Sequence, residues 1–407
     1  MQDILYIDKD LDGITKLNNE IIKVPFSQVG DKVQLNQINS NKKIPVCFDF
    51  TLIEASKPKE NPICKFYGKC GGCKAQHFSH IDYINHKKNN VLNALKSQNI
   101  NLEVEIEFIH HLNAPKNQRR RVDLSVNGKN IGFKEYRSNK VVDIDYCPLI
   151  TEKINTVKSL LRSTVLQIDN HEITGVHITE IDGDLSVMIT SNKKEDITIL
   201  IGLQELFRLD FVVSVFWKFK TFEKLMYKNP LYLHYGNEKI EFIANTFLQA
   251  SVFGEKTLQN LVTSFMEDSK NILDLFSGYG GYAFNLLASN DCFVKAIDID
   301  SQVMAQITKV NNRNLSTMVR NLMKNPLQND ELLNFQATVI NPPRVGALEQ
   351  VKKLAESNLN KIIMVYCSSS SLARDLQILK HYHIKNFVVV DQFIYSPHVE
   401  LVVHLEK

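Results

Sequence analysis

The feature that most constrains the fold is a regular alternation of short apolar runs and helical segments from about residue 236 to the C-terminus. The apolar runs are ILDLF, FVKAID, ATVIN, IIMVYC and FVVVDQF, each about the length of a buried strand. Strands that alternate with helices in this way predict an α/β domain with a doubly wound parallel sheet. No run approaches the roughly 18 apolar residues of a membrane span, so we expect no membrane segment.

The chain of 407 residues is long enough for about two to three domains. Residues 1–55 contain short alternating patterns separated by turn signals, which predicts a small β-barrel of the oligonucleotide-binding type. Residues 56–235 combine a cysteine-rich loop, helical stretches and a hairpin signalled by Asn127-Gly128, which predicts an α+β central domain. Residues 236–407 would then be the third domain.

The composition is that of an ordinary globular protein, with 44% hydrophobic and 23% charged residues. It excludes a disordered chain, a coiled coil and a collagen-like rod. The first residues, MQDILYIDKDLDG, have no basic stretch before an apolar core, so we expect no secretory signal and a cytoplasmic location. A net charge of +3 permits a nucleic-acid partner without requiring one. A monomer is our default expectation.

Four of the 7 cysteines form a pattern typical of a metal centre: Cys64, Cys70, Cys73 and Cys147. The first three have the spacing C-x5-C-x2-C, and the fourth follows in DYCPLI. Four thiolates can surround one soft metal centre. A structural zinc is the alternative, but zinc ribbons favour paired C-x2-C knuckles and this chain has one such pair, which favours an iron–sulfur cluster.

The segment ILDLFSGYGGYAF is a predicted strand that runs into a glycine-rich turn and then a helix. Gly278 and Gly281 allow a ligand to approach the backbone, and Asp298 at the end of the next strand can accept both hydroxyls of a ribose. The pattern also satisfies G-x-G-x-x-A, so a dinucleotide site competes, as does an ordinary turn without a ligand. Asp274, four residues before the first glycine, favours S-adenosylmethionine.

Two further loops follow predicted strands, where open α/β sheets place their ligands. Cys367 ends the strand IIMVYC and is a candidate nucleophile; the alternative is an ordinary buried cysteine. Asn341 begins the NPPR loop after the preceding strand. Glu400, in SPHVELV near the C-terminus, is a candidate general base, with a surface glutamate at a strand edge as the alternative.

These motifs together resemble the uracil-C5 RNA methyltransferase family, in its iron–sulfur branch that acts on 23S ribosomal RNA. The resemblance covers nearly the whole chain and is carried by PICKFYGKCGGCKAQH, IGFKEYRSNKVVDIDYCPL, QRRRVDL, FLQASVFGE, ILDLFSGYGG, KAIDID, NPPRVG, VYCSSSSLARDL and SPHVELV. It implies a Rossmann-like methyltransferase sheet, a central domain with a four-cysteine [4Fe-4S] cluster and an N-terminal barrel similar to a TRAM domain.

The resemblance also implies a role for each matching residue. Catalysis would fall to Cys367, which would add to C6 of the uracil, and to Glu400, which would remove the C5 proton. S-adenosylmethionine would be bound by Gln249, Phe276, Gly278, Gly281, Asp298, Asn321 and Asn341. RNA would be contacted by Lys116, Arg119, Arg120 and Arg121, for which a solvated charged strand is the alternative.

The chain departs from the family's pattern at three places. Asn341 and Asn321 stand where the family has Asp, and Tyr366, Cys367, Ser368 and Ser369 replace Ser-Cys-Asn-Pro. We therefore also consider a weakened or inactive iron–sulfur RNA-binding paralogue, and the same chemistry on transfer RNA. A methyltransferase acting on amino groups and a dinucleotide oxidoreductase are less consistent with Cys367 and with Asp274.

Overall fold

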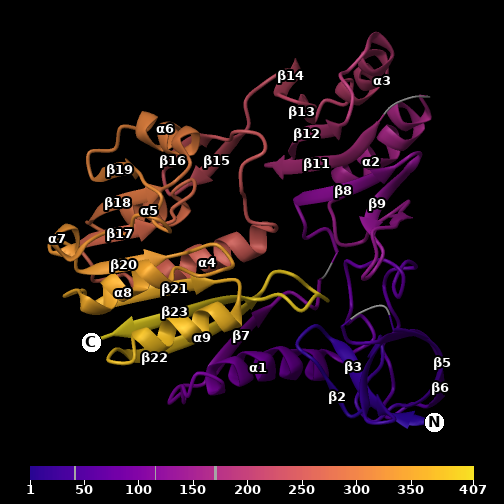
Figure 1. Ribbon diagram of the computed structural model, residues 1–407. Coiled ribbons are helices and arrows are strands. Elements are labelled where there is room, and N and C mark those ends of the chain that lie inside the picture. The colour runs from indigo at the N-terminus through magenta and orange to yellow at the C-terminus, as the bar shows by residue number, and fades with distance from the viewer. Residues whose placement is uncertain (41–42, 115, 169–171) are drawn as a thin grey trace.

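The computed structural model describes residues 1–40, 43–114, 116–168 and 172–407, arranged in three large β-sheets and one two-stranded ribbon (Figure 1). None of the helices described in these ranges is both long and apolar enough to cross a membrane.

An eight-stranded sheet organises the C-terminal half, in the order β19-β18-β17-β20-β21-β23-β22-β7. Its strands are β7 (Ile106–His110), β17 (Asn271–Leu275), β18 (Phe293–Asp298), β19 (Leu315–Val319), β20 (Ala337–Ile340), β21 (Lys361–Tyr366), β22 (His383–Asp391) and β23 (Glu400–Glu406). Strands β19, β18, β17, β20 and β21 are mutually parallel. This confirms the mixed α/β class and the parallel core predicted from the strand–helix alternation.

The far end of this sheet differs from the purely parallel prediction. Strand β23 lies antiparallel between β21 and β22. Residues 392–399 alone connect β22 to β23, and this is too short for the crossover of about a dozen residues that parallel neighbours require. The chain must therefore turn back, so β23 starts at the edge where the parallel strands end.

Helices cover both faces of the sheet because successive strand residues point to opposite sides. Ile272 packs in one apolar cluster and Leu273 in the other. The first cluster holds α4 (Val252–Phe265), α5 (Gly281–Ser289) and α6 (Ser301–Lys309). The second holds α1 (His80–Lys96), α7 (Asn329–Leu332), α8 (Leu348–Glu356) and α9 (Ser369–Ile378).

A seven-stranded sheet lies above this half in Figure 1, in the order β10-β9-β8-β11-β12-β13-β14. Its strands are β8 (Arg121–Asn127), β9 (Asn130–Lys134), β10 (Val141–Asp143), β11 (Ile173–Ile181), β12 (Asp184–Ser191), β13 (Val212–Lys218) and β14 (Phe222–Tyr227), with helices α2 (Glu152–Ser163) and α3 (Ile197–Phe207) against it. The hairpin predicted from Asn127-Gly128 is confirmed as β8–β9. A ribbon of β15 (Tyr232–Tyr235) and β16 (Glu238–Glu241) follows.

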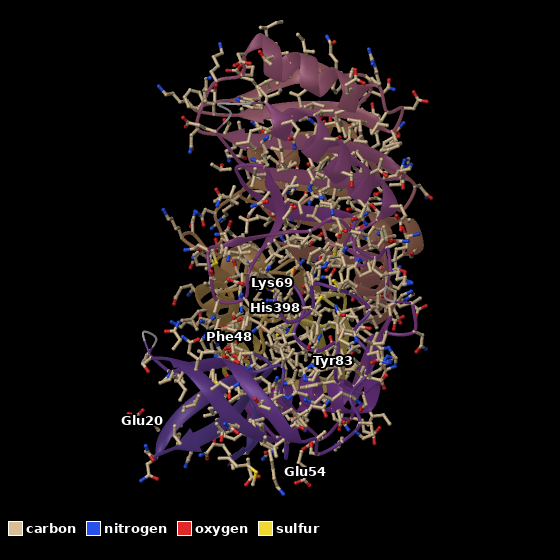
Figure 2. All side chains as sticks on the ribbon, turned by 90° about the vertical axis from the view of Figure 1, so that its right-hand side faces the viewer. Glu20, Phe48, Glu54, Lys69, Tyr83 and His398 are labelled. Carbon is tan, nitrogen blue, oxygen red and sulfur yellow. The ribbon has the colours of Figure 1, made fainter. Side chains whose placement is uncertain are left out.

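The N-terminal six-stranded sheet occupies the lower part of Figure 2, where Glu20 and Glu54 are labelled. Its strands are β1 (Gln2–Asp3), β2 (Tyr6–Ile7), β3 (Asp12–Leu17), β4 (Glu20–Pro25), β5 (Lys32–Asn39) and β6 (Val46–Glu54). The barrel stays a prediction, and so does the division at 55 and 235. Helix α1 and β7, both inside 56–235, pack with the C-terminal sheet.

Candidate active site

The glycine-rich loop follows β17 and leads into α5, as its sequence predicts. Gly278 and Gly280 both have left-handed backbone, with φ of 51° and 71°, which favours glycine. A Cβ at Gly278 would meet nothing within 4 Å, so the loop has open space beside it. The Gly278 N–H donates to the Asp298 carboxylate over 2.9 Å, which ties the loop to the end of β18.

Asp274 lies beneath this loop and is fully buried. Its Oδ2 accepts the Ala283 N–H at 3.1 Å, and its Oδ1 has no hydrogen-bond partner among the described residues. Burial, with a smaller contribution from Asp298, raises the pKa of Asp274 to about 7. A buried acceptor without a partner, beside an open glycine loop, suits a ligand that carries a hydrogen-bond donor.

The predicted nucleophile and base lie at the same edge of the sheet because of the antiparallel strand. Tyr366, the last residue of β21, pairs with Leu401 of β23, so Cys367 and Glu400 are neighbours. Burial and then the Glu400 charge raise the pKa of the Cys367 thiol, against the smaller influence of Arg344.

Glu400 is 5% exposed, and burial raises its pKa to about 7. Its Oε1 accepts a hydrogen bond of 3.0 Å from the Gln392 side-chain amide. The same amide donates to Gln249 Oε1 over 2.8 Å. Two predicted site residues, Glu400 and Gln249, are thus joined by Gln392, a residue that sequence reasoning missed. Gln392 follows Asp391 in the segment DQF, and nothing in that local sequence indicates a contact with Gln249 or Glu400.

The segment that precedes Glu400 is fastened by helix α1. Lys87 Nζ donates to Asp391 Oδ1 over 2.7 Å and to the His398 carbonyl over 2.9 Å, and Tyr83 Oη donates to Asp391 Oδ2 over 2.8 Å. The side chains of Lys87, Asp391 and Tyr83 are buried. The neighbouring Tyr395 carbonyl accepts the Lys74 N–H from the cysteine loop over 2.7 Å. Figure 2 labels Tyr83, Lys69 of that loop and His398 on this side of the molecule.

The two asparagines that depart from the family's pattern have different settings. Asn341 follows β20, and its Nδ2 donates to Tyr282 Oη over 3.5 Å. An aspartate there could not donate this bond. Asn321 Oδ1 accepts the N–H groups of Met323 and Lys324, each at 3.1 Å. An aspartate could accept both, so this replacement preserves the turn. Phe276 adopts a left-handed backbone with a φ of 61°, directly before the glycine loop.

The four predicted ligand cysteines gather at one place. Mutual repulsion between their thiolates adds to burial in raising the pKa of Cys64, Cys70 and Cys73, with Cys147 acting on each. In the described part of the chain, the ligand groups found within 4.8 Å of one another are those of Asp8, Asp10 and Asp12. No three of these sulfurs are therefore as close as a tetrahedral zinc requires, which is about 3.8 Å for Zn–S bonds of about 2.3 Å.

The predicted RNA-contacting residues do not share one environment. Lys116 is exposed, and the Arg119 guanidinium lies 5.5 Å from the Phe393 ring. Arg120 is 7% exposed and pairs with Glu255 at 2.8 Å. Arg121 donates to the Leu248 carbonyl over 3.2 Å, and burial lowers its pKa. Arg120 and Arg121 therefore hold the segment that carries Gln249, a role the charge pattern did not show.

Comparison with known proteins defines the class of this site. The solved structure of Pyrococcus abyssi tRNA (uracil-54, C5)-methyltransferase with S-adenosyl-L-homocysteine has the same fold, with a TM-score of 0.78, 23% identity and 100% of each chain covered. An uncharacterized RNA methyltransferase of Brucella suis is 29% identical over 97% of this chain and 95% of its own. The tRNA (uracil(54)-C(5))-methyltransferase of Pyrococcus furiosus is 25% identical, with 97% of both chains covered.

A family profile described as tRNA (Uracil-5-)-methyltransferase matches residues 130–407, more than half of the chain. The chain belongs to this family. It is an S-adenosylmethionine-dependent RNA uracil-5-methyltransferase. The predicted enzyme class, S-adenosylmethionine as methyl donor and an RNA substrate are confirmed at this level, whereas the iron–sulfur cluster and the ribosomal target stay predictions.

Proposed function

We propose that this enzyme methylates C5 of a uridine through a covalent adduct between Cys367 and C6 of the base. The single observation that carries the proposal is the shared edge: Cys367 directly follows β21 where the antiparallel β23 begins with the buried carboxylate of Glu400. A nucleophile and a base that lie side by side can act on one ring, the first by adding to C6 and the second by removing the proton from C5.

The steps follow from the chemistry of the ring. The Cys367 thiol releases its proton to water, the resulting thiolate adds to C6, and the C5–C6 electron pair moves toward O4 to form an enolate. C5 then attacks the methyl carbon that S-adenosylmethionine supplies on its sulfonium, and S-adenosylhomocysteine leaves. Glu400 takes the C5 proton, the C5–C6 double bond forms again, and the bond to Cys367 breaks. Asn341 would hold the pyrimidine edge, and the target uridine must be unstacked to reach the thiol.

The remaining site residues have proposed roles in binding. Around S-adenosylmethionine, the glycine loop fits the ligand by its open space at Gly278 and the unpartnered Oδ1 of Asp274. Gln249, Phe276, Gly281, Asp298, Asn321 and Asn341 would complete that site. Lys116 and Arg119 would contact RNA phosphates.

We further propose that Cys64, Cys70, Cys73 and Cys147 hold a [4Fe-4S] cluster. The sequence favours a cluster over a single zinc ion, because zinc ribbons use paired C-x2-C knuckles and this chain has one such pair. When bound, it would fix the loop whose Lys74 and Ala75 N–H groups donate to the Tyr395 carbonyl. Anaerobically purified protein should be brown and contain iron and sulfide; colourless protein with stoichiometric zinc would contradict the cluster.

The target that we propose is 23S ribosomal RNA, because the cysteine loop resembles that of the iron–sulfur branch of the family. Transfer RNA is a second candidate because the Pyrococcus relatives, similar over 97% of the chain, are named for uridine 54 of tRNA. The monomeric state and the cytoplasmic location stay predictions.

Nucleoside mass spectrometry of ribosomal and transfer RNA fractions from a deletion strain tests this function. We expect 5-methyluridine to disappear from the ribosomal fraction and to return with the wild-type gene. Its loss from transfer RNA alone would select the second candidate. Unchanged 5-methyluridine in both fractions would contradict the function.

A further inference from the structure

The edge of the seven-stranded sheet carries an unusual mixture of lysines and aromatic rings. Strands β13 and β14 contribute the sequence WKFKTFEKLMYK, residues 217–228, with four lysines and one acidic residue. Phe219, Phe222 and Tyr227 are all more than a third exposed. The Phe222 ring stacks on Phe216 with 4.8 Å between centroids, and Lys224 Nζ lies 3.9 Å from the Tyr227 centroid.

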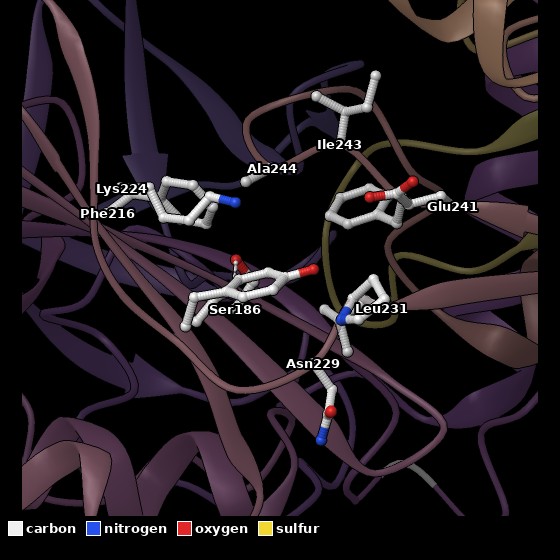
Figure 3. A pocket seen from close by; sticks show the side chains of 12 residues that line it. Ser186, Phe216, Lys224, Asn229, Leu231, Glu241, Ile243 and Ala244 are labelled. Carbon is white, nitrogen blue, oxygen red and sulfur yellow. Dashed lines mark hydrogen bonds between the residues drawn. The ribbon is translucent and has the colours of Figure 1, made fainter.

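A cavity of about 160 Å³ opens beside this hairpin. Figure 3 shows Phe216 and Lys224 on one side and Leu231, Glu241 and Ile243 on the other. The paired hydroxyls of Ser186 and Ser214 also line the cavity, as does Asn229. It is smaller than the roughly 300 Å³ of pockets for drug-sized ligands, so a single flat ring system is the fitting occupant.

Lysines interleaved with exposed aromatic faces are what single-stranded nucleic acids bind, through phosphate attraction and base stacking. Lysine alone on an edge strand would be explained as protection against sheet-to-sheet association. That explanation does not account for the exposed rings or for the polar groups inside the cavity. Since the enzyme acts on RNA, a nucleotide of its own substrate is the occupant that the chemistry favours.

The cavity also adjoins the cofactor loop. The N–H of Ile243, in the cavity wall, donates to Tyr279 Oη over 2.8 Å, and Tyr279 lies between the two loop glycines. This contact joins the cavity wall to the cofactor loop. We propose that the β13–β14 hairpin and this cavity bind an unpaired nucleotide that flanks the target uridine. This inference rests on the proposed function for the identity of the target.

The test uses a fluorescein-labelled oligouridylate of about ten nucleotides, within the usual site size of single-strand binders. In fluorescence anisotropy, Lys224→Ala with Tyr227→Ala should weaken binding about tenfold and lower the slope of log Kd against log salt by about one. Lys194→Ala, an exposed lysine of the same sheet region, is the matched control and should change neither value. S-adenosylmethionine binding should be unaffected in both variants.

Wild-type affinity and salt slope in the double variant would overturn this inference. Failure of the proposed function looks different, because RNA binding would still depend on the hairpin while the wild-type enzyme made no 5-methyluridine.

A separate set of contacts points to Gln392. Its amide nitrogen donates to both Gln249 and Glu400, and the side chain is 3% exposed. A Cβ on Gly254 would lie 2.5 Å from Gln392 Oε1, so α4 leaves room for this side chain by having glycine there. With both N–H groups engaged, the amide fixes the base relative to the cofactor glutamine. We infer that Gln392 is a positioning residue for Glu400 and Gln249.

Gln392→Met tests this positioning role, on the assumption that Glu400 is the base. Methionine has about the same shape as glutamine but lacks the two N–H donors of the side-chain amide. Glu400 also faces the Cys367 thiol and the Tyr282 hydroxyl, which the variant leaves in place. We expect the KM for S-adenosylmethionine to rise several-fold and the ascending limb of the pH–rate profile to move to higher pH, because the charged carboxylate loses its donor. An unchanged KM and pH–rate profile would overturn the positioning role of Gln392. A wrong assignment of Glu400 as the base would show itself differently, because the ascending limb of the profile would then not depend on Glu400.

Discussion

The cofactor loop and the base segment meet at one edge of the sheet but are built by different contacts. In the cofactor loop, Asp274, Gly278 and Asp298 lie within 25 residues, and their hydrogen bonds join β17 to α5 and the loop to β18. The base segment, residues 391–400, is held by Tyr83 and Lys87, which are more than 300 residues away in the chain. The first region can form from local sequence, whereas the second depends on α1 and the cysteine loop.

The largest expected effect is at the nucleophile, where both regions converge. Cys367→Ala should lower methyl transfer at least about a thousandfold, because no other group can add to C6. Calorimetry should find S-adenosylmethionine binding unchanged, since the glycine loop does not involve the thiol. Cys292→Ala, at a buried cysteine elsewhere in the same half, is the control and should keep its activity. Wild-type turnover in Cys367→Ala would remove the nucleophile assignment.

Breaking the anchor of the base segment should have the next largest effect. Lys87→Met leaves the Asp391 carboxylate buried without its cation, which should lower the free energy of unfolding by about 3–5 kcal/mol. Urea denaturation measures this loss. Lys88→Met, at the next and less buried residue, should cost less than about 1 kcal/mol, as substitutions away from buried charge pairs usually do. Equal losses of unfolding free energy in the two variants would contradict a stabilising role of the buried Lys87–Asp391 pair.

The pH dependence sharpens the comparison further. The folded-state pKa of Glu400 is about 7, above its value of about 4.3 in an unfolded chain. The carboxylate is the active form in the proton-removal step, so single-turnover release of 5-methyluridine should rise with pH through about 7 and level off where that step limits the rate. Stability should change in the opposite direction, because the folded protein favours the protonated form of Glu400. The contribution of Glu400 to the free energy of unfolding is fully present below about pH 4 and is lost as the pH rises through about 7.

Asp274 has a raised pKa in the same window, so the rate and the stability must be measured separately. If the ascending limb persists in Glu400→Gln, the rate does not report on Glu400.

The smallest expected effect is within the cofactor loop. Gly278→Ala places no Cβ against another atom, so its cost should be the left-handed backbone alone, about 1–2 kcal/mol. Thermal unfolding measures this loss. S-adenosylmethionine affinity should fall as well, because the added Cβ would stand in the open space that the ligand is proposed to occupy. A loss above about 4 kcal/mol would show that the loop depends on contacts beyond its local conformation.

The same contrast explains how far the sequence could predict the molecule. The parallel strands, the hairpin at Asn127-Gly128 and the place of the glycine loop follow from local patterns and are present. Gln392 and the Lys87–Asp391 pair were not predicted because their partners are remote in the chain. Arg120 was expected to face RNA, but a charge run does not reveal which of its residues turns inward to meet Glu255.

The antiparallel β23 was missed for a related reason. FVVVDQF and the segment after it are apolar runs, and apolarity does not encode strand direction. The short connection between the two runs does indicate the direction, because it has fewer residues than a crossover between parallel strands requires. Counting residues 392–399 would have given the direction of β23 and, with it, the reason why Glu400 lies at the same edge as Cys367.

The central claim is that Cys367 and Glu400 act on the same base in succession. Incubation of Glu400→Gln with S-adenosylmethionine and the RNA that the wild-type enzyme methylates tests it most directly. Because the C5 proton stays in place, the methylated base should remain attached to Cys367 and migrate with the protein on a denaturing gel. Cys367→Ala in the same background should abolish the shifted band. Full 5-methyluridine formation by Glu400→Gln without any adduct would contradict the account.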